Sequence, residues 1–254
     1  MIFKRAIAKL KAQDWLAVSI ELAIVIVGVF IGTWVANWNQ ERVDRRQTHH
    51  LLLQLEPELD RILDFTQNVR AYYATTRRFA QTAFGGWSNE PGVTDHAFVI
   101  AAYQASQIHG LNNSTNWTIV FGGDQLHNID NPKLREPLGR LMSFNIENLN
   151  SNYVMTPYRD DVRKVIPDDL QQRIRDACGD KLRGDTGDFS LPERCDVTLE
   201  EDEVRSTAAE LRRHPALVGE LGQHLATVSS YLNQVTQYEV VIRQLRSRIA
   251  ASRT

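Results

Sequence analysis

Cys178 and Cys195 are the residues whose type and spacing most clearly predict a covalent role in this chain. They flank the stretch CGDKLRGDTGDFSLPERC, whose three glycines and one proline are typical of a loop. A disulfide here would close a loop of about 18 residues and stabilise the fold by roughly 3 kcal/mol. Such a bond persists only in an oxidising compartment. Two unrelated buried thiols are the alternative.

Other residues that could carry catalysis or bind a metal are present, but their spacing fits neither purpose. The sequence contains no nucleophile elbow, P-loop, dinucleotide-binding fingerprint, zincin motif or Cys-x-x-Cys. The acidic pairs Asp160-Asp161 and Asp168-Asp169 fit helix starts, where carboxylates stabilise the positive end of the dipole. Seven histidines lie without ligand spacing at positions 49, 50, 96, 109, 127, 214 and 224. We therefore expect no enzymatic activity, no cofactor and no metal.

An apolar segment near the N-terminus is the element that must position the rest of the chain. Leu16–Ala36 is a run of 21 residues with one charge, Glu21, and a helix of that length crosses the ~30 Å hydrocarbon layer of a bilayer. Trp15 precedes the run, and Trp34 and Trp38 lie at its other end, where aromatic rings favour the membrane–water boundary. We predict one transmembrane helix bounded by these tryptophans. A signal peptide is disfavoured because the run is long and charged and no A-x-A-like site follows it.

One face of this segment combines small residues with its only ionisable group. Glu21, Val25, Gly28, Gly32 and Ala36 follow 4, 3, 4 and 4 spacing, and the two glycines form a G-x-x-x-G element that lets another backbone approach closely. An isolated carboxylate in hydrocarbon costs several kcal/mol, so Glu21 either meets a donor on another subunit or extends back to the head groups. The expected partners are other integral membrane subunits or a second copy.

Charge and cysteine usage predict how the chain is oriented. Four basic residues precede the span and three follow it closely, a slight positive-inside bias, and the cysteine pair places residues 39–254 outside the cytoplasm. Residues 1–14, MIFKRAIAKLKAQD, suit a cytoplasmic or interfacial basic segment, before a span over 15–38. We expect a bacterial inner-membrane location with a periplasmic C-terminal domain. With 29 basic and 31 acidic residues overall, a nucleic-acid partner is not supported.

The periplasmic part is predicted to be an all-α bundle with a long first and a long last helix. After the span, spacings of 3 and 4 relate Leu52, Leu55, Leu59, Ile62, Thr66, Val69 and Tyr73. From Pro215, a seven-residue repeat relates Leu221, Val228, Val235, Ile242 and Ile249, with Leu225 and Leu232 between them. We expect the two helices to pack antiparallel, with Pro57 kinking or restarting the first. The basic end of the last helix, with Arg243, Arg246, Arg248 and Arg253, would then return towards the membrane.

Shorter helices are expected between these two. Thr94 or Asp95 caps a helix that stops near Gly110, Pro132 begins a second, and a third follows Pro167. The apolar positions of the second are Leu134, Leu138, Leu141, Ile146 and Leu149.

Two stretches resemble an uncharacterised bacterial family of single-span membrane proteins, a domain of unknown function. ELAIVIVGVFIGTWVANWNQERVDR is similar to its N-terminal signature, with matches at Glu21, Gly28, Ile31, Trp38, Asn39 and Arg42. TIVFGGDQLHNIDNPKLREPL resembles a later segment, with matches at Gly122, Gly123, Leu126, Ile129, Pro132, Leu134 and Arg135. Together they cover under a fifth of the chain. The resemblance implies a single-span topology and a helical fold, and the family carries no assigned activity.

These patterns favour a non-enzymatic function. We expect an accessory or scaffolding subunit of an inner-membrane complex, or a homo-oligomer, that docks through its transmembrane helix and its periplasmic bundle. The alternative is a periplasmic ligand-binding or sensor module that signals through a partner.

Overall fold

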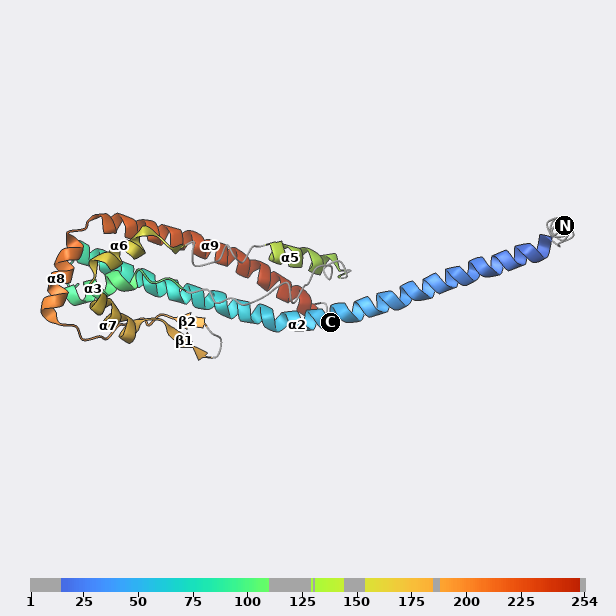
Figure 1. Cartoon of the computed structure of the whole chain (residues 1–254), viewed down its shortest axis with the longest axis horizontal. Helices are drawn as coiled ribbons and strands as arrows, with labels where there is room; N and C mark the ends of the chain where they lie inside the picture. The colour runs from blue at the N-terminus through green and yellow to red at the C-terminus, as the bar shows by residue number, and fades with distance from the viewer. Residues whose placement is uncertain (1–14, 110–128, 130, 144–153, 185–187, 252–254) are drawn as a thin grey trace, which may run out of the picture.

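Two long helices dominate the fold of this chain, as a computed structural model shows (Figure 1). The structure describes residues 15–109, 129, 131–143, 154–184 and 188–251. In chain order the elements are α2 (Trp15–Trp87), α3 (Asp95–Gln104), α5 (Pro132–Ser143), α6 (Pro157–Val165), α7 (Asp168–Cys178), β1 (Lys181–Arg183), β2 (Asp188–Ser190), α8 (Glu201–Arg212) and α9 (Ala216–Ala251). The predicted helical fold, with an apolar N-terminal helix ahead of a bundle, is confirmed.

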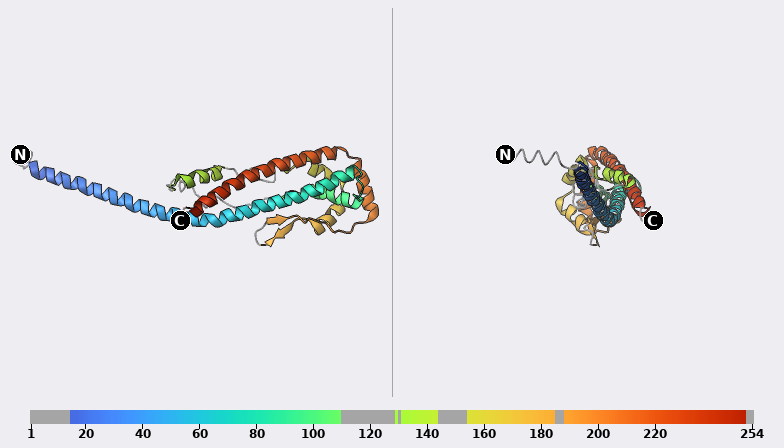
Figure 2. Two further views of the ribbon diagram at one scale, coloured as in Figure 1. Left: turned by 180° about the vertical axis from the view of Figure 1, so that it is seen from behind. Right: turned by 90° about the vertical axis from the view of Figure 1, so that its right-hand side faces the viewer.

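Helix α2 joins the apolar segment and the first helix of the bundle without a break. It contains 73 residues and is therefore about 110 Å long at 1.5 Å per residue. Pro57 lies inside it and does not restart it. Figure 2 shows α2 changing direction near the carboxyl end of α9, the part of the helix that contains Pro57. A proline removes one backbone hydrogen bond and crowds the preceding turn, which accounts for a bend here.

Helix α9 runs antiparallel to α2, as predicted, and the two share the larger part of one core (Figure 2). The buried face of α2 carries Leu55, Leu59, Ile62, Thr66, Val69 and Tyr73, and the side chain of Leu52 lies outside the described part. The seven-residue repeat of α9 is at most 1% exposed at Leu221, Val228, Val235, Ile242 and Ile249. Leu225 and Leu232 are partly buried beside it. A continuous apolar seam therefore holds the two helices together.

A charged contact at the edge of this seam fixes the register of α2 against α9. The guanidinium of Arg70 donates through Nε to Oε1 of Glu239 at 3.1 Å and through Nη2 to Oε2 at 3.2 Å. Nη2 also donates to Oγ1 of Thr236 at 2.7 Å. Because Glu239 is 9% exposed, this two-pronged contact is shielded from solvent on one side and specifies one alignment of the helices.

The distal end of the bundle is a second core in which α2 meets α3, α6, α7 and α8 (Figure 1). Oγ1 of Thr94 accepts the N–H of Ala97 at 3.1 Å, so Thr94 is the N-cap of α3. The fully buried ring of Phe98 packs edge-on against Trp87, with ring centroids 5.1 Å apart. Trp87 Nε1 donates to the carbonyl of Leu211 at 3.0 Å, which ties the end of α2 to α8.

Helix α5 closes the opposite end of the bundle against α9. Pro132 is its first residue, as predicted, and the buried Leu134, Leu138 and Leu141 belong to the core shared by α2 and α9. Pro137 lies within the helix. The remaining two apolar positions predicted for this helix, Ile146 and Leu149, lie outside the described residues.

The cysteine loop contains a hairpin that the sequence did not predict. Strands β1 and β2 pair antiparallel, with Leu182 opposite Phe189. Each strand has three residues, too few for an alternating pattern to be read from the sequence. Arg183 anchors the hairpin to α2 through a two-pronged contact with Asp64, at 2.6 and 3.0 Å.

Candidate functional site

The N-terminal part of α2 is exposed along its whole described length. Ser19–Gln47 is long and apolar enough to span a membrane, and none of its most apolar stretch is buried by the rest of the chain. A helix of this hydropathy in the core of a soluble protein would be covered by other elements. The segment projects away from the bundle as a single helix (Figure 1).

The predicted docking face lies on this exposed helix. Glu21, Val25, Gly28, Gly32 and Ala36 are all exposed, and apart from the adjacent helix backbone no described atom lies within 4 Å of a Cβ built at either glycine. The described part of a single chain therefore brings no group to this face, and its pairing with another helix stays a prediction. Its smooth surface at the glycines is the geometry that close helix contact needs.

This face points away from the side of α2 that packs in the bundle. Leu55 follows Gly28 by 27 residues, which is about seven and a half turns of a helix with 3.6 residues per turn. A half-turn offset places Gly28 on the side opposite Leu55, which is buried against the bundle. The bundle therefore leaves the glycine face open to a partner.

The tryptophans predicted to mark the membrane boundaries lie on the exposed part of α2. Trp15 is the first residue of the helix, and Trp34 and Trp38 are 69% and 57% exposed. Trp15 and Trp34 are separated by about 28 Å along the axis, close to the ~30 Å of the hydrocarbon layer. Their placement at two lipid interfaces stays a prediction.

A neck of α2, residues 39–54, separates the predicted span from the bundle. Its described side chains are exposed except for the half-buried Asp44, and contacts within the helix join Gln40 to Asp44 and Glu41 to Arg45. The bundle begins at Leu55, about 28 Å along the axis from Ala36. About four helical turns therefore separate the predicted span from the bundle.

The basic end of α9 lies at the end of the bundle nearer the predicted span (Figure 1). Arg246 pairs with Asp60 at 3.0 Å, and Arg248 donates to the carbonyl of Lys133 at 2.9 Å. These two arginines therefore hold α9 against α2 and α5, and contact of this end with lipid stays a prediction. Arg243 is exposed, and Arg253 lies outside the described residues.

A buried polar clasp that sequence reasoning missed joins α2 to the hairpin. Asn68 Nδ2 donates to Oδ2 of Asp188 and to the carbonyl of Phe189, both at 2.8 Å. His109 Nε2 lies 3.1 Å from the same carbonyl and 3.3 Å from Oδ1 of Asp188. Nε2 also lies 3.2 Å from Nδ2 of Asn68, so one amide and one imidazole nitrogen share the oxygens of Asp188 and Phe189. The clasp could not be read from the sequence because its members are 41 and 79 residues apart.

The chemistry of this clasp is that of a structural contact. Burial alone would raise the pKa of the Asp188 carboxyl, but the hydrogen bonds and charge of His109, together with Asn68, hold that pKa below its usual value. The neighbouring Tyr72 hydroxyl donates to Oδ1 of Asp180 at 2.7 Å. Burial and then Asp180 raise the pKa of Tyr72, so the phenol stays neutral. No serine or cysteine nucleophile bonds to His109 among the described residues.

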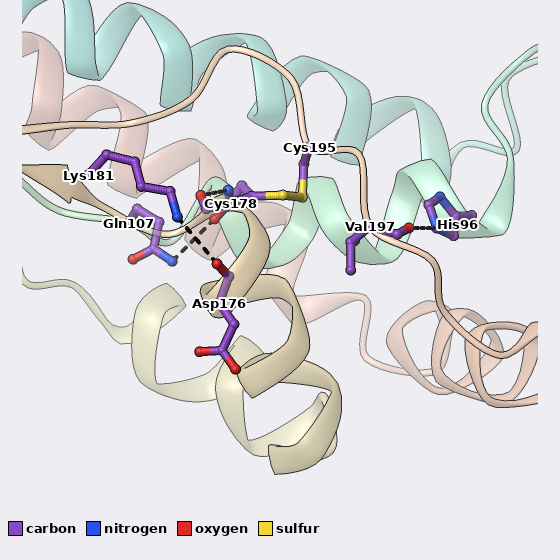
Figure 3. Close-up of a disulfide and its surroundings, with 8 residues drawn as sticks. His96, Gln107, Asp176, Cys178, Lys181, Cys195 and Val197 are labelled. Atoms are coloured by element: carbon purple, nitrogen blue, oxygen red, sulfur yellow. Dashed lines mark hydrogen bonds between the residues drawn. A yellow bond between two sulfur atoms is a disulfide. The ribbon is translucent and has the colours of Figure 1, made fainter.

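The predicted disulfide joins the end of α7 to the loop between β2 and α8 (Figure 3). Cys178 and Cys195 are bonded, which rejects the alternative of two separate thiols. The carbonyl of Cys178 accepts Nε2 of Gln104 at 2.7 Å, and Lys181 Nζ donates to the carbonyl of Asp176 at 3.3 Å. The bond therefore closes the loop that carries the hairpin and fixes it against α3.

The histidines are scattered in the fold as they are in the sequence. No group of three histidine, cysteine, aspartate or glutamate side chains suited to a metal occurs among the described residues. His96 contacts the carbonyl of Val197 at 2.8 Å, and His214 contacts that of Glu210 at 2.9 Å. His224 is buried, with Nδ1 2.8 Å from Oγ1 of Thr156. His127 and the side chain of His49 lie outside the described part.

His224 should make the stability of this protein depend on pH. Burial, and then the charge of Arg159, lower the pKa of His224 from its usual 6.5 to about 4. The unfolded chain therefore takes up a proton below pH 6.5 that the folded chain takes up only near pH 4. Stability should fall as the pH drops through this window, by about 2 kcal/mol between pH 7 and pH 5.

The measurement is urea unfolding of the full-length protein in detergent at pH 7 and pH 5. His224→Gln should lose about 2 kcal/mol less than the parent over this interval, since glutamine does not titrate. The exposed His214→Gln variant is the matched control and should behave as the parent does. Equal losses in the parent and in His224→Gln would contradict the assignment.

A small cleft of about 300 Å³ lies at the distal end, between the starts of α3 and α8. Its charged groups are engaged in ion pairs: Asp95 with Arg212, and Glu201 with Arg205, each at 2.8 Å. Its carboxylates are therefore each neutralised by an arginine.

The fold and exposed helix define a class: a helical bundle carried on one long helix whose N-terminal part can span a membrane. Comparisons with protein-family models, curated proteins and solved structures found no match to this chain.

Proposed function

We propose that this chain is an accessory or scaffolding subunit of a bacterial inner-membrane complex. It docks in the membrane through the face of Glu21, Val25, Gly28, Gly32 and Ala36, and its bundle presents a second surface in the periplasm. The observation that carries the proposal is the exposure of an apolar helix of spanning length that continues directly into the bundle. A partner helix would cover the two glycines and give Glu21 a donor.

The proposal places the N-terminus in the cytoplasm and the bundle in the periplasm. The Cys178–Cys195 bond supports this orientation, because disulfides persist in oxidising compartments. The basic residues before the span point the same way.

The docking face makes a specific prediction for Gly28→Leu/Gly32→Leu. Two leucines would fill the smooth surface and hold a partner backbone away, so we expect the complex to weaken by at least about tenfold, or roughly 1.4 kcal/mol. The measurement is the fraction of chain cross-linked to a partner in native membranes, followed by native electrophoresis in mild detergent.

Ile26→Leu/Phe30→Leu is the matched control, because the step of 100° per residue places these two exposed positions on the side of the helix opposite the glycines, and it should leave the complex intact. Glu21→Gln, which removes the charge and keeps a hydrogen-bonding group, distinguishes a paired carboxylate from one that extends to the head groups. A wild-type protein that migrates alone, or a complex unchanged by the two leucines, would refute docking through this face.

A further inference from the structure

The side of α9 that faces away from the bundle exposes no charged residue over about seven turns. Between Ala216 and Ile242, ten positions are exposed: Ala216, Gly219, Gly222, Gln223, Ala226, Ser230, Asn233, Gln234, Gln237 and Val240. On α7, by contrast, four of the six exposed positions are Asp or Arg. Depletion of charged residues is typical of the buried centre of a protein interface. The outer face of α9 therefore has the composition of a surface that another chain covers.

The exposed positions of α9 repeat with the same period as its buried ones. Successive steps of 4 and 3 residues relate the outer seam, which consists of Gly219, Gln223, Ala226, Ser230, Asn233, Gln237, Val240 and Gln244. At 100° per residue, Asn233 lies about 150° around the helix from the buried Val228 and Val235. The outer seam therefore runs opposite the buried repeat for about 38 Å. Alternating steps of 4 and 3 are the spacing with which one helix packs along another.

The amide side chains of the outer seam are not engaged within the described part of the chain. No hydrogen bond joins the side chains of Gln223, Asn233, Gln237 and Gln244 to described residues. The hydroxyl of Ser230, by contrast, donates to the carbonyl of its own helix at Ala226, at 3.2 Å. Each amide carries two N–H donors and one acceptor oxygen. The outer seam therefore presents a row of hydrogen-bonding groups that a neighbouring helix can pair with.

A second copy of this chain matches that combination of groups. Two copies anchored in one membrane, as the proposed function requires, point the same way, so their α9 helices run parallel. In a parallel two-fold contact each residue meets its own counterpart. A charged residue would meet a like charge there, which is costly, whereas an amide can both donate to and accept from its copy. A helix face that pairs with itself is therefore uncharged and rich in amides, as the outer seam is.

We propose that the outer seam of α9 pairs two copies of this chain into a parallel dimer. The dimer identifies the second surface that the bundle presents in the periplasm, and it rests on the proposed function for the common direction of the two copies. Helix α9 forms one long edge of the bundle, where a second copy can reach it (Figures 1 and 2). Gly219 and Ala226 allow a close approach, and Asn233, halfway along, fixes the register because a shifted pairing leaves its amide without a partner.

Cysteine cross-linking of the full-length protein in native membranes tests this pairing. Asn233→Cys and Gln237→Cys should each produce a band of twice the 29.0 kDa chain on non-reducing electrophoresis, because each thiol meets its own copy across the two-fold axis. Cys178 and Cys195 are the two cysteines of the sequence and are bonded to each other, so the added thiol is the one that reacts.

Two exposed glutamines provide the matched controls. Gln234→Cys lies on the same helix but is turned by about 100° from Asn233, and Gln172→Cys lies on α7. Both should remain monomeric. Since all four substituted positions are exposed, each variant should fold normally.

A charge placed on the outer seam should separate the two copies. Asn233→Lys/Gln237→Lys brings like charges together across the two-fold axis, and we expect the Kd of the dimer to rise at least about tenfold. The measurement is analytical ultracentrifugation of the full-length protein in detergent. Gln172→Lys makes the same change at an exposed position of α7 and should leave the Kd unchanged.

The variant Gly28→Leu/Gly32→Leu distinguishes this dimer from docking in the membrane. The cross-link of Asn233→Cys should survive in that background, and its loss would assign the pairing to the span and overturn the outer seam. Monomers at both seam positions, or a cross-linked band that contains a different protein, would overturn the dimer and leave the docking face in place. An equally strong cross-link at Gln172→Cys would also overturn it, because the contact would then not be specific to α9.

Discussion

Gly86→Ala should destabilise this protein by about 3 kcal/mol or more, because the added methyl group has no space. A Cβ at this position would overlap Cγ and Cδ2 of Phe98 and lie 2.6 Å from its Cβ. Phe98 cannot move aside: its ring is fully buried against Trp87, and the guanidinium of Arg212 lies 5.0 Å above it. Thermal unfolding followed by circular dichroism should show a midpoint lower by about 6–12 °C.

Gly222→Ala is the matched control for this prediction. Gly222 lies inside α9 with nothing within 4 Å of a built Cβ, so alanine should leave stability unchanged or raise it by up to about 1 kcal/mol. If both variants melted like the parent, the close approach of α2 and α3 at Gly86 would be wrong.

Removing the disulfide should cost about 3 kcal/mol. The bond joins residues 17 apart in the sequence, and opening a loop of this length restores conformational entropy to the unfolded chain. Cys178→Ala/Cys195→Ala should lower the midpoint of urea unfolding and release the hairpin, which the loop holds near α3. Protease digestion should then cut residues 179–194 first, because a released surface loop is a preferred cleavage site.

Reduction provides an independent measurement of the same effect. The parent protein treated with dithiothreitol should unfold at the urea concentration found for the double alanine variant, and the reductant should not change that variant further. A parent that is indifferent to reductant would show that the bond contributes nothing measurable to stability.

The sequence was sufficient where a pattern repeats along one helix. The seven-residue repeat of α9 and the spacing from Leu55 to Tyr73 on α2 both identified buried faces, because helical geometry alone decides which positions share a side. Local residue preferences predicted the start of α5 at Pro132 and narrowed the N-cap of α3 to Thr94 or Asp95, of which the structure shows Thr94.

The sequence was insufficient where a feature depends on contacts between distant segments. Helices α6 and α8 are short and strongly polar, and their ends are defined mainly by packing in the distal core. The clasp of Asn68, His109 and Asp188 combines residues from separate elements, so no spacing reveals it. The docking face is the reverse case, since its pattern is clear in the sequence but the proposed partner is another chain.

The neck sets the distance between the predicted span and the bundle. If the span crosses a bilayer with an average tilt of about 20°, the first buried residue of the bundle, Leu55, would lie roughly 25 Å from Ala36 along the membrane normal. If the proposed docking is right, a partner with short loops outside the membrane would contact this chain only within the bilayer, whereas a partner with a taller external domain would also reach the neck. Deleting whole helical turns from the neck would move the bundle closer to the membrane, and would then weaken only the contacts of the second kind of partner.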